Sequence, residues 1–148
     1  MRRPPSLLRT WLVLACLTAP GLACAAVVIV AHGNVRKLDV TQVQRIYTGR
    51  LVELAGQALL PVNQAPGSLA RQRFLNDYLQ QDEDRYIAYW TVRRYVGKGV
   101  PPRELSTVGD VIAYIVNTPG AIAYLDESEV PAGMNVVATR SSAASGPR

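Results

Sequence analysis

The chain has 148 residues, a formal net charge of +5 and two cysteines, and 18% of its residues are charged. This length suffices for one domain. The charge excess is small, and no dense basic run carries interleaved aromatic residues, which argues against a nucleic-acid-binding protein.

Residues 1–25 have the layout of a secretory signal peptide. Arg2, Arg3 and Arg9 come first, an apolar run over 11–19 follows, and Ala23-Cys24-Ala25 is a small-residue cleavage signal. The apolar run is shorter than the roughly 20 residues of a membrane-spanning helix. Cleavage would leave a periplasmic protein with a net charge of about +2, because three of the sixteen basic residues and none of the acidic ones lie in the segment.

Both cysteines also lie in this segment, so the cleaved protein would have neither thiol nor disulfide. One alternative stays open, namely that Cys24 carries a lipid. Gly21-Leu22-Ala23-Cys24 is a poor lipidation signal, because no large aliphatic residue stands three positions before the cysteine.

The first elements after residue 26 are a strand, a helix and a second strand. Residues 27–32 form a β-branched apolar run typical of a buried strand. Asp39 and Gln42 predict a capping box at the start of a helix that Gly49 ends. Residues 57–63 predict the second strand, in which Pro61 indicates an edge or a bulge.

Two further helices follow. One is expected from Ser68 to about Leu79, and three acidic residues, Asp82, Glu83 and Asp84, then suit the start of another. Tyr86, Tyr89, Trp90 and Arg93 recur on one face of that helix and predict its buried side. Residues 98–105 are expected to be a loop, because two adjacent prolines cannot continue a helix.

The last helix begins with a capping box at Thr107 and Asp110. A turn at 117–120 leads to closing strands over 121–125 and 135–139, and residues 140–148 are expected to be disordered. Strands and helices thus alternate, which predicts an α/β fold with a small mixed sheet flanked by helices.

Four segments resemble, in the same order, segments of periplasmic phosphate-binding proteins of ABC transporters. They are Leu38–Arg50, Pro61–Phe74, Tyr89–Pro102 and Thr118–Tyr124. The resemblance implies the fold of a type II periplasmic binding protein over residues 26–139. The full-length family closes two lobes on phosphate, whereas this chain is long enough for a single, three-layer-like lobe.

The resemblance also implies a ligand site at the start of the helix after the second strand. Aligned on Phe74, Ser68 matches the family's ligand serine, but Gln64 replaces its phosphate-binding arginine and Leu69-Ala70 replace Gly-Thr. The implied oxyanion-binding residues are Gly67, Ser68, Leu69 and Arg71, with Arg71 and Arg73 as partial substitutes for the missing charge. No cofactor, metal or catalytic residue is implied.

Each of these residues also has a simpler interpretation. Ser68 suits an N-cap, and Arg71 suits a solvated arginine on an exposed helix face, which we favour over the ligand role. His32 is expected to bond locally at a strand end, since one histidine does not make a metal site. Asp82, Glu83 and Asp84 are expected to be a charged first turn rather than a metal cluster.

Two functions are therefore open. The chain is either a non-catalytic module related to the substrate-binding proteins, binding phosphate or another oxyanion weakly near Gly67-Ser68, or a periplasmic protein-interaction or sensory module that kept the fold and lost the ligand site. The partner would be an envelope protein, a transporter subunit or a second copy of the chain.

Overall fold

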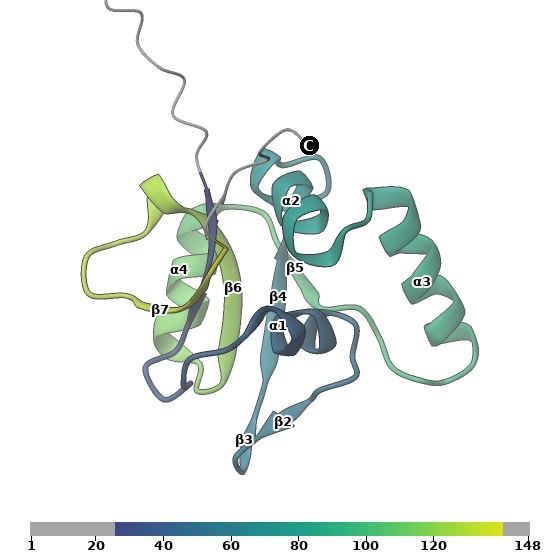
Figure 1. The fold of residues 1–148 in the computed structure, drawn as a ribbon, viewed down its shortest axis with the longest axis horizontal. Coiled ribbons are helices and arrows are strands. Elements are labelled where there is room, and N and C mark those ends of the chain that lie inside the picture. The colour runs from purple at the N-terminus through teal and green to yellow at the C-terminus, as the bar shows by residue number, and fades with distance from the viewer. Residues whose placement is uncertain (1–25, 141–148) are drawn as a thin grey trace, which may run out of the picture.

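The computed structural model describes residues 26–140, so the predicted signal peptide and residues 141–148 of the predicted tail lie outside the described part. A five-stranded mixed sheet forms its centre, in the order β5-β4-β6-β1-β7 (Figure 1). The strands are β1 Val27–Ala31, β4 Leu60–Gln64, β5 Arg103–Leu105, β6 Ala121–Asp126 and β7 Asn135–Thr139. A hairpin of β2 Glu53–Leu54 and β3 Gln57–Ala58 lies beside the sheet.

The sheet is mixed because β1 and β4 pair with their neighbours in different ways. β1 runs antiparallel to both β6 and β7, with a register shift between Ile29 and Val30. β4 runs parallel to both β5 and β6. All five residues of β1 are buried, as the β-branched apolar run predicts for a strand covered on both faces.

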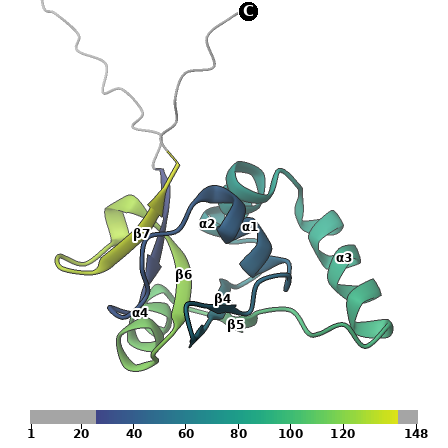
Figure 2. The same cartoon turned by 60° about the horizontal axis from the view of Figure 1, so that its bottom comes forward.

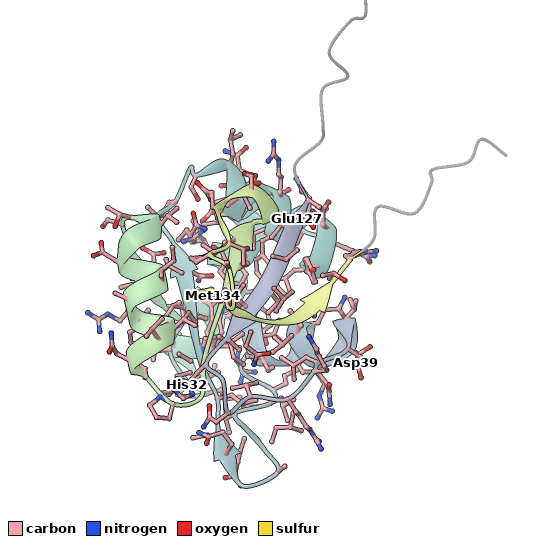
Figure 3. The ribbon with its side chains drawn as sticks, turned by 90° about the vertical axis from the view of Figure 1, so that its left-hand side faces the viewer. His32, Asp39, Glu127 and Met134 are labelled. Carbon is pink, nitrogen blue, oxygen red and sulfur yellow. The ribbon has the colours of Figure 1, made fainter. Side chains whose placement is uncertain are left out.

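Helices cover both faces of the sheet. One face carries α1 Val40–Tyr47, α2 Leu69–Phe74 with its π-helical continuation η1 Leu75–Leu79, and α3 Glu83–Tyr95. The other face carries α4 Val108–Asn117. Figure 3 shows α4 on one side of β1 and β7 and α1, which follows Asp39, on the other. This confirms the predicted α/β fold with three layers.

The helix starts confirm the predictions from capping residues. Asp39 accepts from the backbone N–H of Gln42 at 2.7 Å, and the side chain of Gln42 accepts from the backbone N–H of Asp39 at 3.0 Å. Asp82 and Thr107 accept from the backbone N–H of Arg85 and Asp110 and so cap α3 and α4. The capping box expected at Thr107 is only half formed, because Asp110 accepts from the Thr107 hydroxyl instead of from its backbone N–H. These bonds span only three residues, which explains why the sequence alone predicts them.

Two predictions about strands are wrong. The strand expected over 57–63 is divided between β3 and β4 at Leu59, and β4 is an inner strand rather than an edge. Pro61 is tolerated because β5 pairs only with Val62–Gln64, so β4 has a neighbour on one side only at the proline. The expected loop over 98–105 contains β5, a three-residue strand held by its pairing with β4.

Gly120 joins the last helix to β6 at a close approach of two backbones. Its φ is +82°, and a Cβ there would lie 2.0 Å from the carbonyl oxygen of Ala58. The prediction that Gly120 serves the turn therefore holds, and the contact with β3 adds a second reason for glycine.

Candidate functional site

The helix start after β4 has the geometry of an N-cap. Ser68 Oγ accepts from the backbone N–H of Arg71 at 3.2 Å, and Gly67 has a φ of +85°. The side chain of Leu69 is exposed, so this end of α2 reaches solvent. The prediction of Ser68 as a cap is confirmed, whereas its role as an oxyanion ligand remains a prediction.

Arg71 is the most unexpected residue of this region. Its side chain is 2% exposed, so the prediction of a solvated arginine on an exposed helix face is wrong. Nε and Nη2 donate to the two carboxylate oxygens of Glu83 at 2.9 and 2.6 Å. Nη1 donates to Glu104 Oε1 and to the carbonyl oxygen of Gln64, both at 2.8 Å. The guanidinium thus joins α2 to α3, β4 and β5.

The charge of Arg71 is neutralised inside the protein. Burial alone would lower its pKa, but the hydrogen bonds to Glu104 and Glu83 outweigh burial and raise it. The guanidinium therefore stays charged, and the cluster of Arg71, Glu83 and Glu104 formally carries one excess negative charge. Such a cluster offers an anion no net attraction.

Gln64, which stands where the family has its phosphate-binding arginine, and Arg73, the other possible substitute for its charge, also have partners inside the protein. Gln64 is buried, and its Nε2 donates to the carbonyl oxygen of Tyr124 at 3.0 Å. Arg73 forms an ion pair with Asp126 at 2.9 Å. The amide at position 64 thus has a structural role in linking β4 to β6.

A layer of buried aromatic and amide groups lies beside Arg71. Asn63 donates to Tyr86 Oη at 3.1 Å and accepts from Tyr124 Oη at 3.4 Å. The ring of Tyr124 stacks on Phe74 with centroids 4.1 Å apart. Burial raises the pKa of Tyr86 and Tyr124, so both hydroxyls stay protonated at neutral pH. The layer supplies hydrogen bonds and shape, and it supplies no general base.

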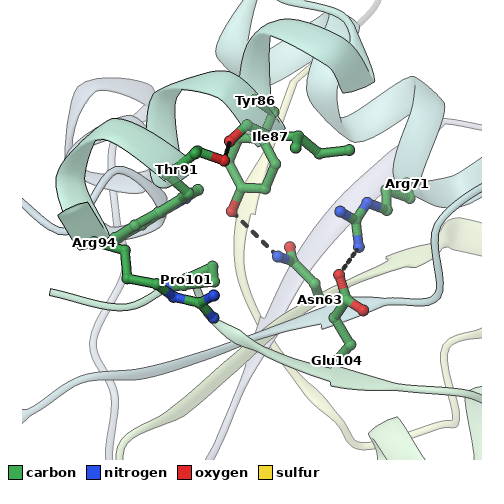
Figure 4. A pocket seen from close by; sticks show the side chains of 9 residues that line it. Asn63, Arg71, Tyr86, Ile87, Thr91, Arg94, Pro101 and Glu104 are labelled. Atoms are coloured by element: carbon green, nitrogen blue, oxygen red, sulfur yellow. Dashed lines mark hydrogen bonds and ion pairs between the residues drawn. The ribbon is translucent and has the colours of Figure 1, made fainter.

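A cavity of about 210 Å³ opens between α3, β4 and β5 (Figure 4). Its lining combines two guanidinium groups, one carboxylate, neutral polar side chains and apolar ones: Asn63, Arg71, Tyr86, Ile87, Trp90, Thr91, Arg94, Pro101 and Glu104. Of the four predicted site residues only Arg71 reaches it, whereas Gly67, Ser68 and Leu69 do not. Sequence reasoning missed Asn63, Arg94 and Glu104, because no motif links positions that meet only through folding.

In the described part of the chain we also looked for a functional histidine, a metal site and a membrane-spanning helix. His32 Nδ1 lies 2.6 Å from Asn34 Oδ1, which confirms the expected local hydrogen bond. Between residues 26 and 140, no three His, Cys, Asp or Glu side chains are grouped so that they could hold a metal ion. None of the helices in this range is long and apolar enough to cross a membrane.

No protein-family model and no curated protein matches the chain. Among the solved structures that are similar to it are two for which 76% of this chain is covered. One is an ABC-type phosphate transport receptor from Vibrio cholerae, with a TM-score of 0.58 and 14% identity. The other, from Clostridium perfringens, is assigned as a phosphate ABC transporter substrate-binding protein with bound phosphate, with a TM-score of 0.59 and 18% identity.

The chain spans less than half the length of either structure, 45% and 44% respectively. At this level of identity the likeness establishes the fold and leaves the activity open. In fold, the chain is similar to a single lobe of phosphate ABC transporter substrate-binding proteins.

Proposed function

We propose that this chain is an exported, non-catalytic, solute-binding-like module that acts in the periplasm through contact with another protein and has no tight oxyanion site. The observation that carries the proposal is the internal neutralisation of Arg71 by Glu83 and Glu104. The predicted signal peptide supports export, and the similarity in fold to substrate-binding proteins supports a binding role.

The binding free energy available at this helix start is too small for a tight phosphate site. A helix start exposed to solvent contributes about 0.3–1 kcal/mol to binding an anion. Nanomolar affinity needs about 12 kcal/mol, and millimolar affinity still needs about 4 kcal/mol. Ser68 adds one hydroxyl, and Arg71 would have to leave two carboxylates before it could bind phosphate. We therefore expect a dissociation constant for phosphate above about 1 mM.

A second candidate function is weak oxyanion binding at Gly67, Ser68 and Leu69. The specific observation in its favour is the solvent-exposed start of α2, where the positive φ of Gly67 turns the chain into the helix. Backbone N–H groups at such a start favour anions even when a side chain caps the helix. Arg71 belongs to this candidate only if it exchanges its carboxylate partners for the anion.

A titration with inorganic phosphate, followed by the amide NMR shifts of the purified protein, separates the two functions. The proposed function predicts no saturable shift at Gly67, Ser68 or Leu69 below about 1 mM phosphate. A saturable shift centred on these residues, lost in a folded Ser68→Pro variant, would establish the second candidate instead.

A variant in which Arg71 loses one carboxylate partner tests whether neutralisation of Arg71 is what weakens phosphate binding. Glu104→Gln removes one of the two neutralising charges and should strengthen phosphate binding several-fold over the wild type. The matched control is Glu53→Gln in β2, an exposed carboxylate without a described ion pair, which should leave the titration unchanged. Equal behaviour of the two variants would show that neutralisation of Arg71 is not what suppresses binding.

A further inference from the structure

The cavity between α3, β4 and β5 has a buried floor and an exposed rim. The floor consists of side chains that are at most 5% exposed, namely Asn63, Arg71, Tyr86 and Trp90. The rim consists of exposed residues of α3 and β5, namely Ile87, Thr91, Arg94 and Glu104. Figure 2 shows α3 at the margin of the molecule, with a segment from its end leading back to β5. A volume of about 210 Å³ has room for several water molecules, and so for one small organic molecule.

The floor contains a buried hydrogen-bond donor. Nε1 of Trp90 is buried, and no group in the described part of the chain accepts its hydrogen. The far end of the indole ring, Cη2 and Cζ3, lies against Gly49 and Gly99, which do not line the cavity. Burial raises the pKa of Tyr86, and the nearness of Asn63 and Trp90 lowers it in part, so Nε1 lies on the side of the Tyr86 hydroxyl. A buried donor without a partner is unfavourable, and a ligand with an acceptor at this place would remove that cost.

Two groups of opposite charge line the rim without forming an ion pair with each other. Arg94 makes no ion pair or side-chain hydrogen bond with any residue between 26 and 140. Glu104 binds Arg71 with one carboxylate oxygen, and its other oxygen accepts from no donor in that range. Figure 4 shows Arg94 and Glu104 reaching the cavity from α3 and β5. With Glu83, the partner of Arg71, these groups formally carry two positive and two negative charges, so the site as a whole is neutral.

We propose that this cavity binds the zwitterion of a small apolar α-amino acid. The α-carboxylate accepts from the guanidinium of Arg94 and from Nε1 of Trp90, which lie one helical turn apart on α3. The α-ammonium donates to the free carboxylate oxygen of Glu104. The apolar side chain lies against Ile87 and Pro101. The proposal goes beyond the proposed function, which assigns no small ligand to the chain.

The charges of the lining favour a zwitterion over other small ligands. An inorganic anion would pair with Arg94 but would also lie beside the carboxylate of Glu104, which disfavours it. A neutral sugar would shield both charges from water without neutralising either. A zwitterion pairs with both, through charge-assisted hydrogen bonds at each end.

The test is an NMR titration of the nitrogen-15-labelled protein with L-valine and L-leucine, in which the indole N–H signal of Trp90 is followed. Trp90→Phe, which lacks this signal, assigns it. A new hydrogen bond to Nε1 should move the signal downfield in a saturable way, with a dissociation constant between about 10 µM and 1 mM. N-Acetylvaline lacks the ammonium and valinamide lacks the carboxylate, so each should bind at least about tenfold more weakly than valine.

Two substitutions on α3 form a matched pair. Arg94→Gln should weaken valine binding at least about tenfold, because the carboxylate loses its charged partner. Arg85→Gln removes the same charge from the same helix, at an exposed position that does not line the cavity, and should leave the affinity unchanged. Trp90→Phe keeps an aromatic ring without the N–H and should weaken binding several-fold, as measured by the amide signals of Asn63 and Glu104.

No saturable shift with either amino acid up to about 10 mM would overturn the proposal. Equal affinities for valine and N-acetylvaline would overturn it too, as would equal effects of Arg94→Gln and Arg85→Gln. A dispersed amide spectrum establishes that each variant is folded. A protein that binds neither valine nor phosphate removes only this inference, whereas phosphate binding below about 1 mM removes the proposed function whether or not valine binds.

Discussion

Replacing Glu83 with Gln should destabilise the protein far more than the same change at Glu104. Glu83 accepts two of the four hydrogen bonds of the Arg71 guanidinium and is 27% exposed, whereas Glu104 accepts one and is 49% exposed. Removing one partner of a buried ion pair costs about 3–5 kcal/mol. Because Arg71 keeps Glu104 and the carbonyl of Gln64, we expect about 2–3 kcal/mol for Glu83→Gln.

For Glu104→Gln we expect about 0.5–1.5 kcal/mol, since its carboxylate is largely solvated. Asp84→Asn is the matched control in the same turn as Glu83 and should cost at most about 1 kcal/mol through the helix dipole. Urea unfolding measured by fluorescence suits this comparison, because Trp90 is the one tryptophan between residues 26 and 140. A loss of 2–3 kcal/mol moves the midpoint by roughly 1–2 M urea.

Two results would refute this reasoning. If Glu83→Gln and Asp84→Asn shifted the urea midpoint equally, the ion pair would not be what holds Arg71 in the interior. If Glu104→Gln cost more than Glu83→Gln, the more exposed carboxylate would be the main partner of the guanidinium. Either result would also weaken the proposed function, because that proposal depends on a fully engaged Arg71.

Three further predictions concern the fold. Gly120→Ala should lower the free energy of unfolding by about 2 kcal/mol or more, because the added Cβ meets the backbone of β3. The control is Gly133→Ala, where φ is +80° but no atom lies near the added Cβ, and it should cost only about 1 kcal/mol. Equal losses in urea unfolding would show that the contact with β3 does not matter. Ser68→Ala should cost about 1 kcal/mol as a lost N-cap, and no change would disprove the cap. Burial raises the pKa of Tyr47 and Tyr124, so the folded state retains protons that the unfolded state releases. Stability should therefore fall above about pH 10, less steeply in Tyr124→Phe, and a flat thermal-melt profile to pH 11 would contradict this.

The sequence predicted the helix starts and the buried faces because both depend on short spacings. Asp39, Asp82 and Thr107 each cap a helix through residues three positions away. Tyr86 and Trp90 lie four residues apart on one face of α3 and are buried as expected. The order of motifs also predicted the fold of a substrate-binding-protein lobe, which the two similar structures support.

The candidate site could be predicted only in part. Ser68 was predicted as a cap, but the burial of Arg71 was not, since its partners are 12 and 33 residues away. A lone arginine on a short helix is usually solvated, and only the packing of α2 against α3, β4 and β5 brings two carboxylates to it. The strand β5 was missed for the same reason, because its three residues are held by pairing with β4.

The sequence by itself determined the local structure: where each helix begins, which apolar residues of the helices face the core, and the alternation of strands and helices. The tertiary structure decided which charges meet. It withdrew Arg71 from solvent, left apolar side chains of α3 exposed, and opened a cavity beside Asn63 and Glu104. The physical reason is that capping and periodicity act within a few residues along the chain, whereas ion pairing and burial depend on contacts between distant segments.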